Sequence, residues 1–119
     1  MDTQLNKEPI NKKIKLDFND SKYATGRRKK SIARVWLKKG SGKIHVNGKQ
    51  MVDYFKKQNL QIAISRPFAV VKRDNEFDVR CSVKGGGLSG QAGAIIHGIS
   101  RAIVEFEPDL KQTLKKEKL

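Results

Sequence analysis

The sequence predicts a small α+β domain with a mixed sheet of about four strands and helices on one face. Segments 31–39 and 77–84 alternate apolar and polar side chains with the period of a half-buried strand. From about residue 91 to 106, apolar residues recur at spacings of three and four, as in a helix with one buried stripe. With 119 residues, 37% of them hydrophobic, the chain suffices for one domain and one small core.

Three parts follow one another along the chain. Residues 1–22 are polar and lack periodicity, which predicts a flexible N-terminal arm. Residues 23–106 hold the periodic segments and are expected to form the globular core. Residues 107–119, beginning just before Pro108, allow a short basic C-terminal helix.

The first strand of the core is expected at 31–39. Gly40-Ser41-Gly42 then marks a turn, and residues 43–47 alternate again with Ile44 and Val46 inward. The two segments predict an antiparallel hairpin. Asn47-Gly48 predicts a second turn.

The middle of the core is expected to be mostly helical. Residues 50–57 predict a short helix, and 60–65 add a helical turn that Pro67 ends. Residues 68–72 predict a short strand, and Asp74-Asn75 a turn before the strand at 77–84.

Four glycines separate that strand from the last helix, which is expected to open at about Gln91. Glycine lets the backbone adopt positive φ and approach a ligand closely, and a helix N-terminus favours anions. Gly85, Gly87 and Gly90 satisfy G-x-G-x-x-G, which alone would suggest a dinucleotide-dependent enzyme. A Rossmann unit needs a further parallel strand bearing an acid about 20 residues on. Asp109 is at that distance in a helix-like segment, which disfavours the enzyme.

Net charge points instead to polymeric phosphate. The chain has 26 Lys and Arg against 12 Asp and Glu, and no acid lies between Arg27 and Val52. Repulsion among so many positive side chains destabilises the free domain, and bound phosphates relieve that repulsion and release counterions. The alternatives are a solvated basic surface and a general basic nucleic-acid-binding module. No apolar run approaches the roughly 20 residues needed to cross a bilayer, and no membrane partner is expected. Cys81, the only cysteine, is expected to be buried and inert.

Two blocks of sequence closely resemble ribosomal protein nine of the small subunit, of the bacterial and organellar type. The first block is 23–35 (Tyr-Ala-Thr-Gly-Arg-Arg-Lys-Lys-Ser-Ile-Ala-Arg-Val), followed by 40–44 and 46–48. The second block matches the family signature at Gly85-Gly86-Gly87, Gly90, Gln91, Ala94, Gly98, Ser100, Arg101 and Ile103.

The resemblance covers roughly residues 23–116. It implies a fold with left-handed βαβ character, similar to the second domain of ribosomal protein five. It implies a structural, non-enzymatic role in translation, on ribosomal RNA in the head of the small subunit and beside other head proteins. The ribosome would lie in the bacterial cytoplasm or in a mitochondrion or plastid. Members end in a basic tail that reaches transfer RNA in the P site. The sequence as given stops at Lys118-Leu119, before such a tail, because it is cut, because the rest is a separate chain or because this member has lost the tail; the contact is therefore assigned to no residue.

The residues expected to contact RNA are mostly cations and turn glycines, because arginine forks and lysine point charges both bind phosphate. His97 and Arg101, with Ala94 one turn back, predict a second RNA-facing surface off the core stripe. No cofactor is expected. No metal is expected either, because His45 is a lone histidine on an outer strand face and has no partner ligands. The full set is Arg27, Arg28, Lys29, Lys30, Arg34, Lys38, Lys39, Lys43, Lys49, Lys84, Gly85, Gly86, Gly87, Gly90, Gln91, His97 and Arg101.

Trp36 leaves two interpretations open. It shares a strand face with Arg34 and Lys38 and can stack on a base or sugar. It can equally cover the hydrophobic edge of the sheet.

Overall fold

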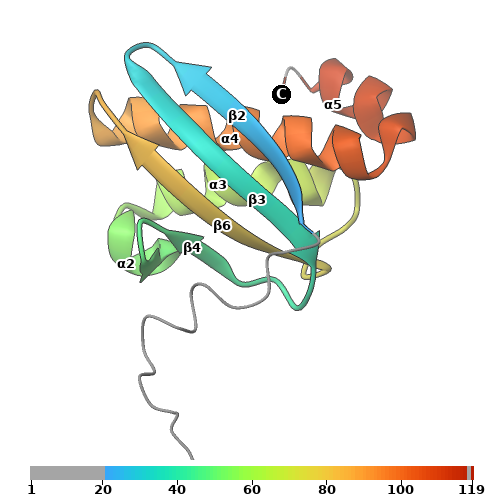
Figure 1. Cartoon of the computed structure of the whole chain (residues 1–119), viewed down its shortest axis with the longest axis horizontal. Helices are drawn as coiled ribbons and strands as arrows, with labels where there is room; N and C mark the ends of the chain where they lie inside the picture. Colours follow the sequence, from blue (N-terminus) through green and yellow to red (C-terminus); the bar gives the residue numbers. More distant parts are fainter. Residues whose placement is uncertain (1–20, 118) are drawn as a thin grey trace, which may run out of the picture.

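A five-stranded mixed sheet is covered on one face by helices, as predicted, in a computed structural model that describes residues 21–117 and 119 (Figure 1). Most of the flexible arm predicted for residues 1–22 lies outside the described residues, which begin at 21. The first strand in the described part of the chain, β2, already begins at Lys22. In chain order the elements are β2 Lys22–Arg28, β3 Ser31–Lys39, β4 Ile44–Val46, β5 Lys49–Gln50, α2 Met51–Tyr54, α3 Gln58–Val70, β6 Phe77–Lys84, α4 Leu88–Phe106, the 3-10 turn η1 Pro108–Leu110 and α5 Lys111–Lys116.

The strands lie in the order β2-β3-β6-β4-β5. β3 is antiparallel to both β2 and β6, whereas β4 is parallel to β6. The predicted hairpin between β3 and β4 is therefore wrong, because β6 lies between them. The hairpin partner of β3 is β2, which the sequence pattern did not reveal as a strand.

Asp78, near the start of β6, explains why the chain does not fold straight back after β3. Its Oδ1 accepts hydrogen bonds from the backbone N–H groups of Ser41 (3.0 Å), Gly42 (3.2 Å) and Lys43 (3.0 Å). Gly40 packs so closely on the same carboxylate that a Cβ would not fit. The loop thus wraps around the end of β6 and places β4 on its far side.

The predicted turns next to β4 and β6 are confirmed. Asn47 and Gly48 both have positive φ (51° and 82°) between the antiparallel strands β4 and β5, and Asn75 has φ 59° before β6. Positive φ at both central residues is the geometry that tight hairpins between twisted strands require.

β4, α3 and β6 form a βαβ unit, because β4 and β6 are parallel neighbours joined through α2 and α3. In Figure 1 the helices lie behind the sheet and the connection has the left-handed sense that the resemblance implied. The predicted strand at 68–72 is wrong, since α3 continues through Pro67 to Val70. Ile64, Phe68 and Val71 are buried at helical spacing, so core packing outweighs the hydrogen bond that the proline removes.

α4 crosses the sheet under β2 and β3 and packs beside α3. It begins at Leu88, three residues before the predicted start, because Gly87 is its N-cap and its carbonyl accepts the N–H of Gln91 (2.9 Å). The predicted core stripe is confirmed at Ile95, Ile99 and Ile103, which are fully buried. Pro108 follows the helix end, as expected. In the described part of the chain, no helix is long and apolar enough to span a bilayer.

One face of α4 differs from the prediction. Ala94, expected off the core stripe, is fully buried, and Gly98 is buried with it. A Cβ on Gly26 of β2 would collide with the backbone at both positions. Small residues on both sides therefore let the helix and the edge strand touch backbone to backbone.

Candidate nucleic-acid interface

The glycine turn between β6 and α4 is a rigid, left-handed bend. Gly85 and Gly86 have φ of 87° and 61°, which only glycine adopts without strain. The carbonyl of Gly85 accepts hydrogen bonds from Ser31 Oγ (2.7 Å) and Gln91 Nε2 (3.2 Å). A Cβ on Gly85 would collide with the carbonyl of Lys30, so the turn lies directly against the β2–β3 hairpin.

A chain of side-chain hydrogen bonds fixes this turn from the other side. Gln91 Oε1 accepts from the hydroxyl of Tyr54 (2.7 Å), which in turn accepts from Asn47 Nδ2 (3.2 Å). The Asn47 side chain also pairs with the backbone of Val83, through its N–H (2.8 Å) and its carbonyl (3.0 Å). Gln91, a predicted RNA contact, is thus a positioning residue in this structure. Neither Tyr54 nor Asn47 was predicted as a site residue; Asn47 was noted as part of a turn and of the first block of the resemblance.

The basic residues of the β2–β3 hairpin meet the glycine turn in space. The stem of Arg28 packs on Gly93 of α4, where a Cβ would lie 2.8 Å from Arg28 Cγ. Lys29, with φ 56°, occupies the hairpin turn, and Lys84 lies across the sheet from Ile32. We call this end of the molecule the glycine-turn surface; it comprises Arg27, Arg28, Lys29, Lys30, Lys84, Gly85, Gly86, Gly87 and Gly90.

The start of α4 is the open part of the glycine-turn surface. Gly87, Leu88 and Ser89 are exposed, and nothing lies within 4 Å of a Cβ built on Gly87. The first N–H groups of a helix lack intrahelical acceptors and lie at the positive end of its dipole. This site can therefore receive an anionic oxygen without rearrangement. Gly90 is different, because it is buried against Ser31 and has a packing role.

The remaining predicted lysines lie elsewhere. Lys38, Lys39 and Lys43 are at the opposite end of β3 from the hairpin turn, and Lys49 is on the far edge strand β5. Lys39 is directed to the helix side, with its Nζ 6.0 Å from the centroid of the Phe106 ring. The structure therefore does not bring these four into the glycine-turn surface.

His97 and Arg101 hold the edge strand β2 onto α4. His97 Nδ1 accepts the backbone N–H of Arg27 (3.1 Å), and Arg101 Nη1 donates to the carbonyl of Thr25 (2.9 Å). Ala94 and Gly98 are buried where this part of α4 packs against β2. His97 and Arg101 themselves are exposed beside that contact, so their predicted contact with RNA stays a prediction.

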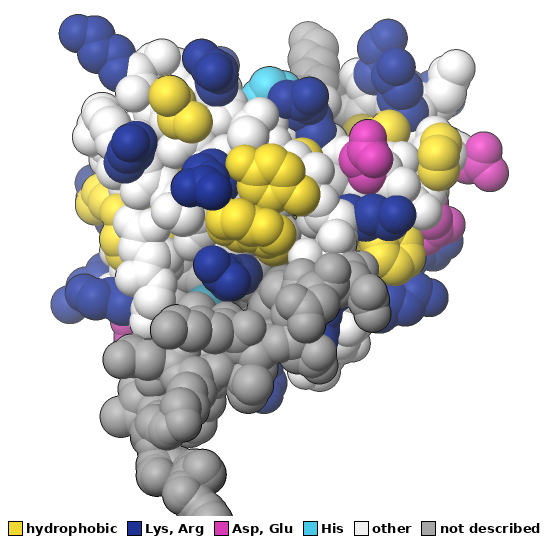
Figure 2. All heavy atoms as spheres, viewed as in Figure 1, with side chains coloured by type: hydrophobic (Ala, Val, Ile, Leu, Met, Phe, Trp, Pro, Cys, Tyr) yellow, Lys and Arg dark blue, Asp and Glu magenta, His cyan; other side chains and the backbone are white. Residues whose placement is uncertain are grey.

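The acidic side chains concentrate in the helical layer. Arg66 pairs with Glu117 (2.8 Å), and Arg73 pairs with Glu107 (3.2 Å) and lies 3.9 Å from Glu76. The hydrogen bond from Arg73, with its charge, holds the pKa of Glu107 below its ordinary value. On the sheet side, Figure 2 shows Lys and Arg side chains spread over the face and the acids gathered toward α5.

Asp78 is the acid that lies at one end of the sheet face, and its charge is already engaged. Partial burial alone would raise its pKa, but the three backbone N–H donors from Lys43, Ser41 and Gly42 outweigh burial and lower the pKa. The other predicted contact on this face, Arg34, lies near the middle of β3 with Trp36. Two more residues there, Tyr23 and Arg80, were not predicted to contact RNA. For Arg80 the alternation along its strand was the available signal, whereas Tyr23 lies on β2, where the sequence pattern gave none.

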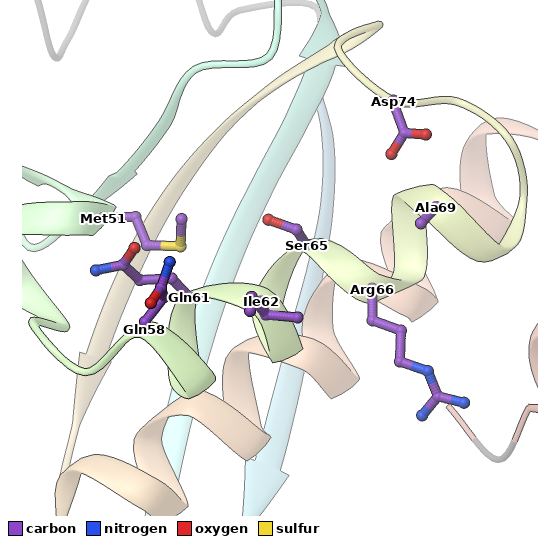
Figure 3. Close-up of a pocket in the computed structure, with 8 residues that line it drawn as sticks. All are labelled: Met51, Gln58, Gln61, Ile62, Ser65, Arg66, Ala69 and Asp74. Carbon is purple, nitrogen blue, oxygen red and sulfur yellow. The ribbon is translucent and has the colours of Figure 1, made fainter.

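A shallow groove of about 420 Å³ lies along α3, in the helical layer (Figure 3). Met51, Gln58 and Gln61 lie at one end of it, Asp74 lies at the other, and the Arg66 side chain points away. It contains no histidine or cysteine, and among the described residues no cluster of three His, Cys, Asp or Glu could hold a metal. Nothing in the groove resembles catalytic machinery.

Taken together, these features define a small basic α+β protein in which one group of cations, Arg27 to Lys30 and Lys84, surrounds a fixed glycine turn. Residues 26–119 match the model of the family described as ribosomal protein S9/S16. The chain belongs to the ribosomal protein S9/S16 family and is a structural ribosomal protein, not an enzyme. The dinucleotide alternative was therefore wrong, and no strand follows α4 in the described residues.

Proposed function

We propose that this ribosomal protein is protein nine of the small subunit and binds ribosomal RNA in the subunit head through the glycine-turn surface. The observation that carries the proposal is the meeting of the β2–β3 hairpin with the start of α4. Arg28 packs on α4, and Lys30 contacts the turn through its carbonyl. Four consecutive cations, Arg27 to Lys30, thereby flank a helix N-terminus whose N–H groups are open.

The mechanism is electrostatic positioning. Crowded phosphates are neutralised by Arg27, Arg28, Lys29, Lys30 and Lys84, and the release of counterions favours the complex. Arginine adds bidentate geometry, and the helix N-terminus adds N–H donors for a phosphate oxygen. Because phosphate contacts position without reading bases, recognition rests mainly on RNA shape.

The ribosome would be bacterial or that of a mitochondrion or plastid, and other head proteins would be neighbours. Lys38, Lys43 and Lys49 would serve as outlying phosphate contacts, since all three lie on the surface away from the core. His97 and Arg101 would also contact RNA, through the parts of their side chains that are exposed beside β2.

The test is binding to a transcript of the head domain of small-subunit ribosomal RNA, measured at several salt concentrations. We expect the double variant Arg27→Ala/Arg28→Ala to bind more weakly, with a slope of log K against log salt shallower by about 1 to 2. Lys115→Ala/Lys116→Ala, in α5, removes the same charge from the helical layer and is the matched control. An unchanged salt slope, or an equal effect of the control pair, contradicts the proposed surface.

A further inference from the structure

The outer face of the sheet carries a transverse row of aromatic and cationic residues. Register places Tyr23 opposite Trp36, Trp36 opposite Arg80, and Arg80 opposite His45, across four neighbouring strands. All four side chains are on the face away from the helices, since their neighbours in the strands are buried in the core. The residues come from segments about 60 positions apart, and only the fold aligns them.

The centre of the row is a stack of rings and guanidinium groups. The Tyr23 and Trp36 rings are 5.1 Å apart, and the Cζ atoms of Arg80 and Arg34 lie 4.6 Å and 5.3 Å from the Trp36 ring centroid. Arg34 Nε also donates to the Tyr23 hydroxyl (3.4 Å). Tyr23 is 46% exposed, and Trp36 is half-buried. Figure 2 shows hydrophobic side chains at the centre of this face with Lys and Arg around them.

Covering the core does not account for this arrangement. The residues beneath the row, Val35, Leu37 and Val79, are already fully buried against the helices on the other face. Two guanidinium groups on one indole repel each other, and among the described residues neither is paired with a carboxylate. An anion beside a flat apolar group would relieve the repulsion and use the exposed rings at the same time.

We propose that this outer face binds an unpaired nucleotide of RNA. Its base stacks on the rings of Tyr23 and Trp36, and Arg34 and Arg80 turn from the indole to the adjacent phosphates. Stacking tolerates any base and is the usual way in which sheets hold single-stranded RNA. The inference rests on the proposed function, because RNA is the partner in both. Arg27 lies four residues along β2 from Tyr23, about 13 Å away, so one RNA segment can contact both surfaces.

Trp36, the only tryptophan of the chain, is a built-in reporter. The full chain is titrated with short single-stranded oligoadenylate, with duplex RNA of equal length and with inorganic polyphosphate. We expect oligoadenylate to quench Trp36 emission strongly, because a stacked base contacts the indole. Polyphosphate binds by charge alone and should leave the emission nearly unchanged. Equal responses to oligoadenylate and polyphosphate, or no response to oligoadenylate at saturation, overturn the inference.

Variants then measure the stacking directly, by fluorescence anisotropy of labelled oligoadenylate. Trp36→Leu should weaken binding about 5- to 150-fold, the range of one lost base–aromatic stack, and leave the salt slope unchanged. Trp36→Phe retains a ring and should recover most of the affinity. Ile62→Ala is the control, because Ile62 is a 65% exposed apolar side chain on α3, away from the sheet.

The outcomes separate this inference from the proposed function. If Trp36→Leu binds like the unmodified chain while Arg27→Ala/Arg28→Ala binds weakly, stacking is refuted and the glycine-turn surface stands. If the reverse holds, the sheet face binds RNA and the glycine-turn surface is refuted. If oligoadenylate and the head-domain transcript both fail to bind, both proposals fall, and a protein partner is the remaining occupant of the face.

Discussion

Gly26→Ala should be among the most destabilising single-methyl changes in this chain. Gly26 is the point of β2 that touches α4. A Cβ there would lie 2.9 Å from Gly98 Cα and closer still to the Ala94 carbonyl oxygen and the Gly98 nitrogen. Ordinary contact begins at 3.4 Å, and all three atoms are backbone, so no side chain can rotate away. The contact with Gly98 Cα alone requires a separation of about 0.5 Å, and the two nearer backbone atoms require more.

The expected cost follows from that separation. A gap of 0.5 Å already removes about a quarter of the dispersion attraction across the contact, and overpacking by one methyl group costs about 1–3 kcal/mol. Movement of β2 also weakens the hydrogen bonds that His97 and Arg101 make to it, each contributing about 1 kcal/mol. We therefore expect the free energy of unfolding to fall by about 3 kcal/mol or more.

Urea unfolding followed by circular dichroism measures this change, with Gly87→Ala as the control. Gly87 has φ −96° and ψ 177°, which alanine adopts freely, and its Cβ would meet open space. The two substitutions restrict the unfolded chain equally, so their difference isolates the collision. Gly87→Ala should change stability by less than about 1 kcal/mol. If the two variants agree within about 0.5 kcal/mol, the close approach of β2 and α4 is not what the structure indicates.

Two further predictions concern titratable groups. The pKa of Asp78 is lower in the folded than in the unfolded chain, so its stabilisation is complete above the ordinary Asp pKa of 3.8 and is lost as pH falls through the folded-state value. Asp78→Asn should thus unfold about 1 kcal/mol more easily at pH 7, and the difference should shrink as pH falls through the folded-state pKa of Asp78; a stability gap independent of pH refutes the role of the charge. Burial raises the pKa of Cys81 to about 12, so a thiol reagent at pH 8 should label it only as the chain unfolds; labelling of the native protein at the rate of a free thiol contradicts this.

Periodicity predicted β3, β6 and α4 because each buries one continuous apolar face. β2 escaped for a physical reason. Its core-facing residues, Ala24 and Gly26, are small because α4 lies so close, and small residues give no apolar signal. The close packing of β2 on α4 thus requires small residues, and their small size removes the apolar alternation by which a strand is predicted.

The order of the strands in the sheet could not be predicted from the local pattern of apolar residues. Alternation shows that residues 43–47 form a strand but not which strand they pair with. The pairing is decided by Asp78, which lies 35 residues after Lys43 in the sequence. The Asp78 carboxylate binds the loop before β4 and holds it around the end of β6. Likewise, Pro67 predicts a helix end from local sterics, whereas burial of Phe68 on the far side of it depends on the assembled core.

For the candidate site, too, the sequence predicted the residues but not their arrangement in space. The cations of 27–30 and the glycines of 85–90 were both singled out, from composition and from the glycine motif. Their meeting in space was not visible, nor was the alignment of Tyr23 and Arg80 on Trp36, because register across three strands creates it. Lys39 lies beside the 40–42 turn, as predicted, but local pattern could not show that its Nζ lies over the Phe106 ring on the helix side.

α4 connects the two proposed RNA contacts mechanically. Its N-terminus is held by the Gly85 carbonyl and by the hydrogen bonds through Gln91, and its middle is held to β2 by His97 and Arg101. β2 in turn carries Tyr23 and Arg27. A helix fixed at both places can bind phosphate at one end and keep the stacking row aligned without ordering new backbone. Since ordering costs about 1–2 kcal/mol per residue, a preformed surface retains more of its contact energy as affinity. Loosening this helix should therefore weaken both proposed RNA contacts together, although α4 itself provides part of only the first.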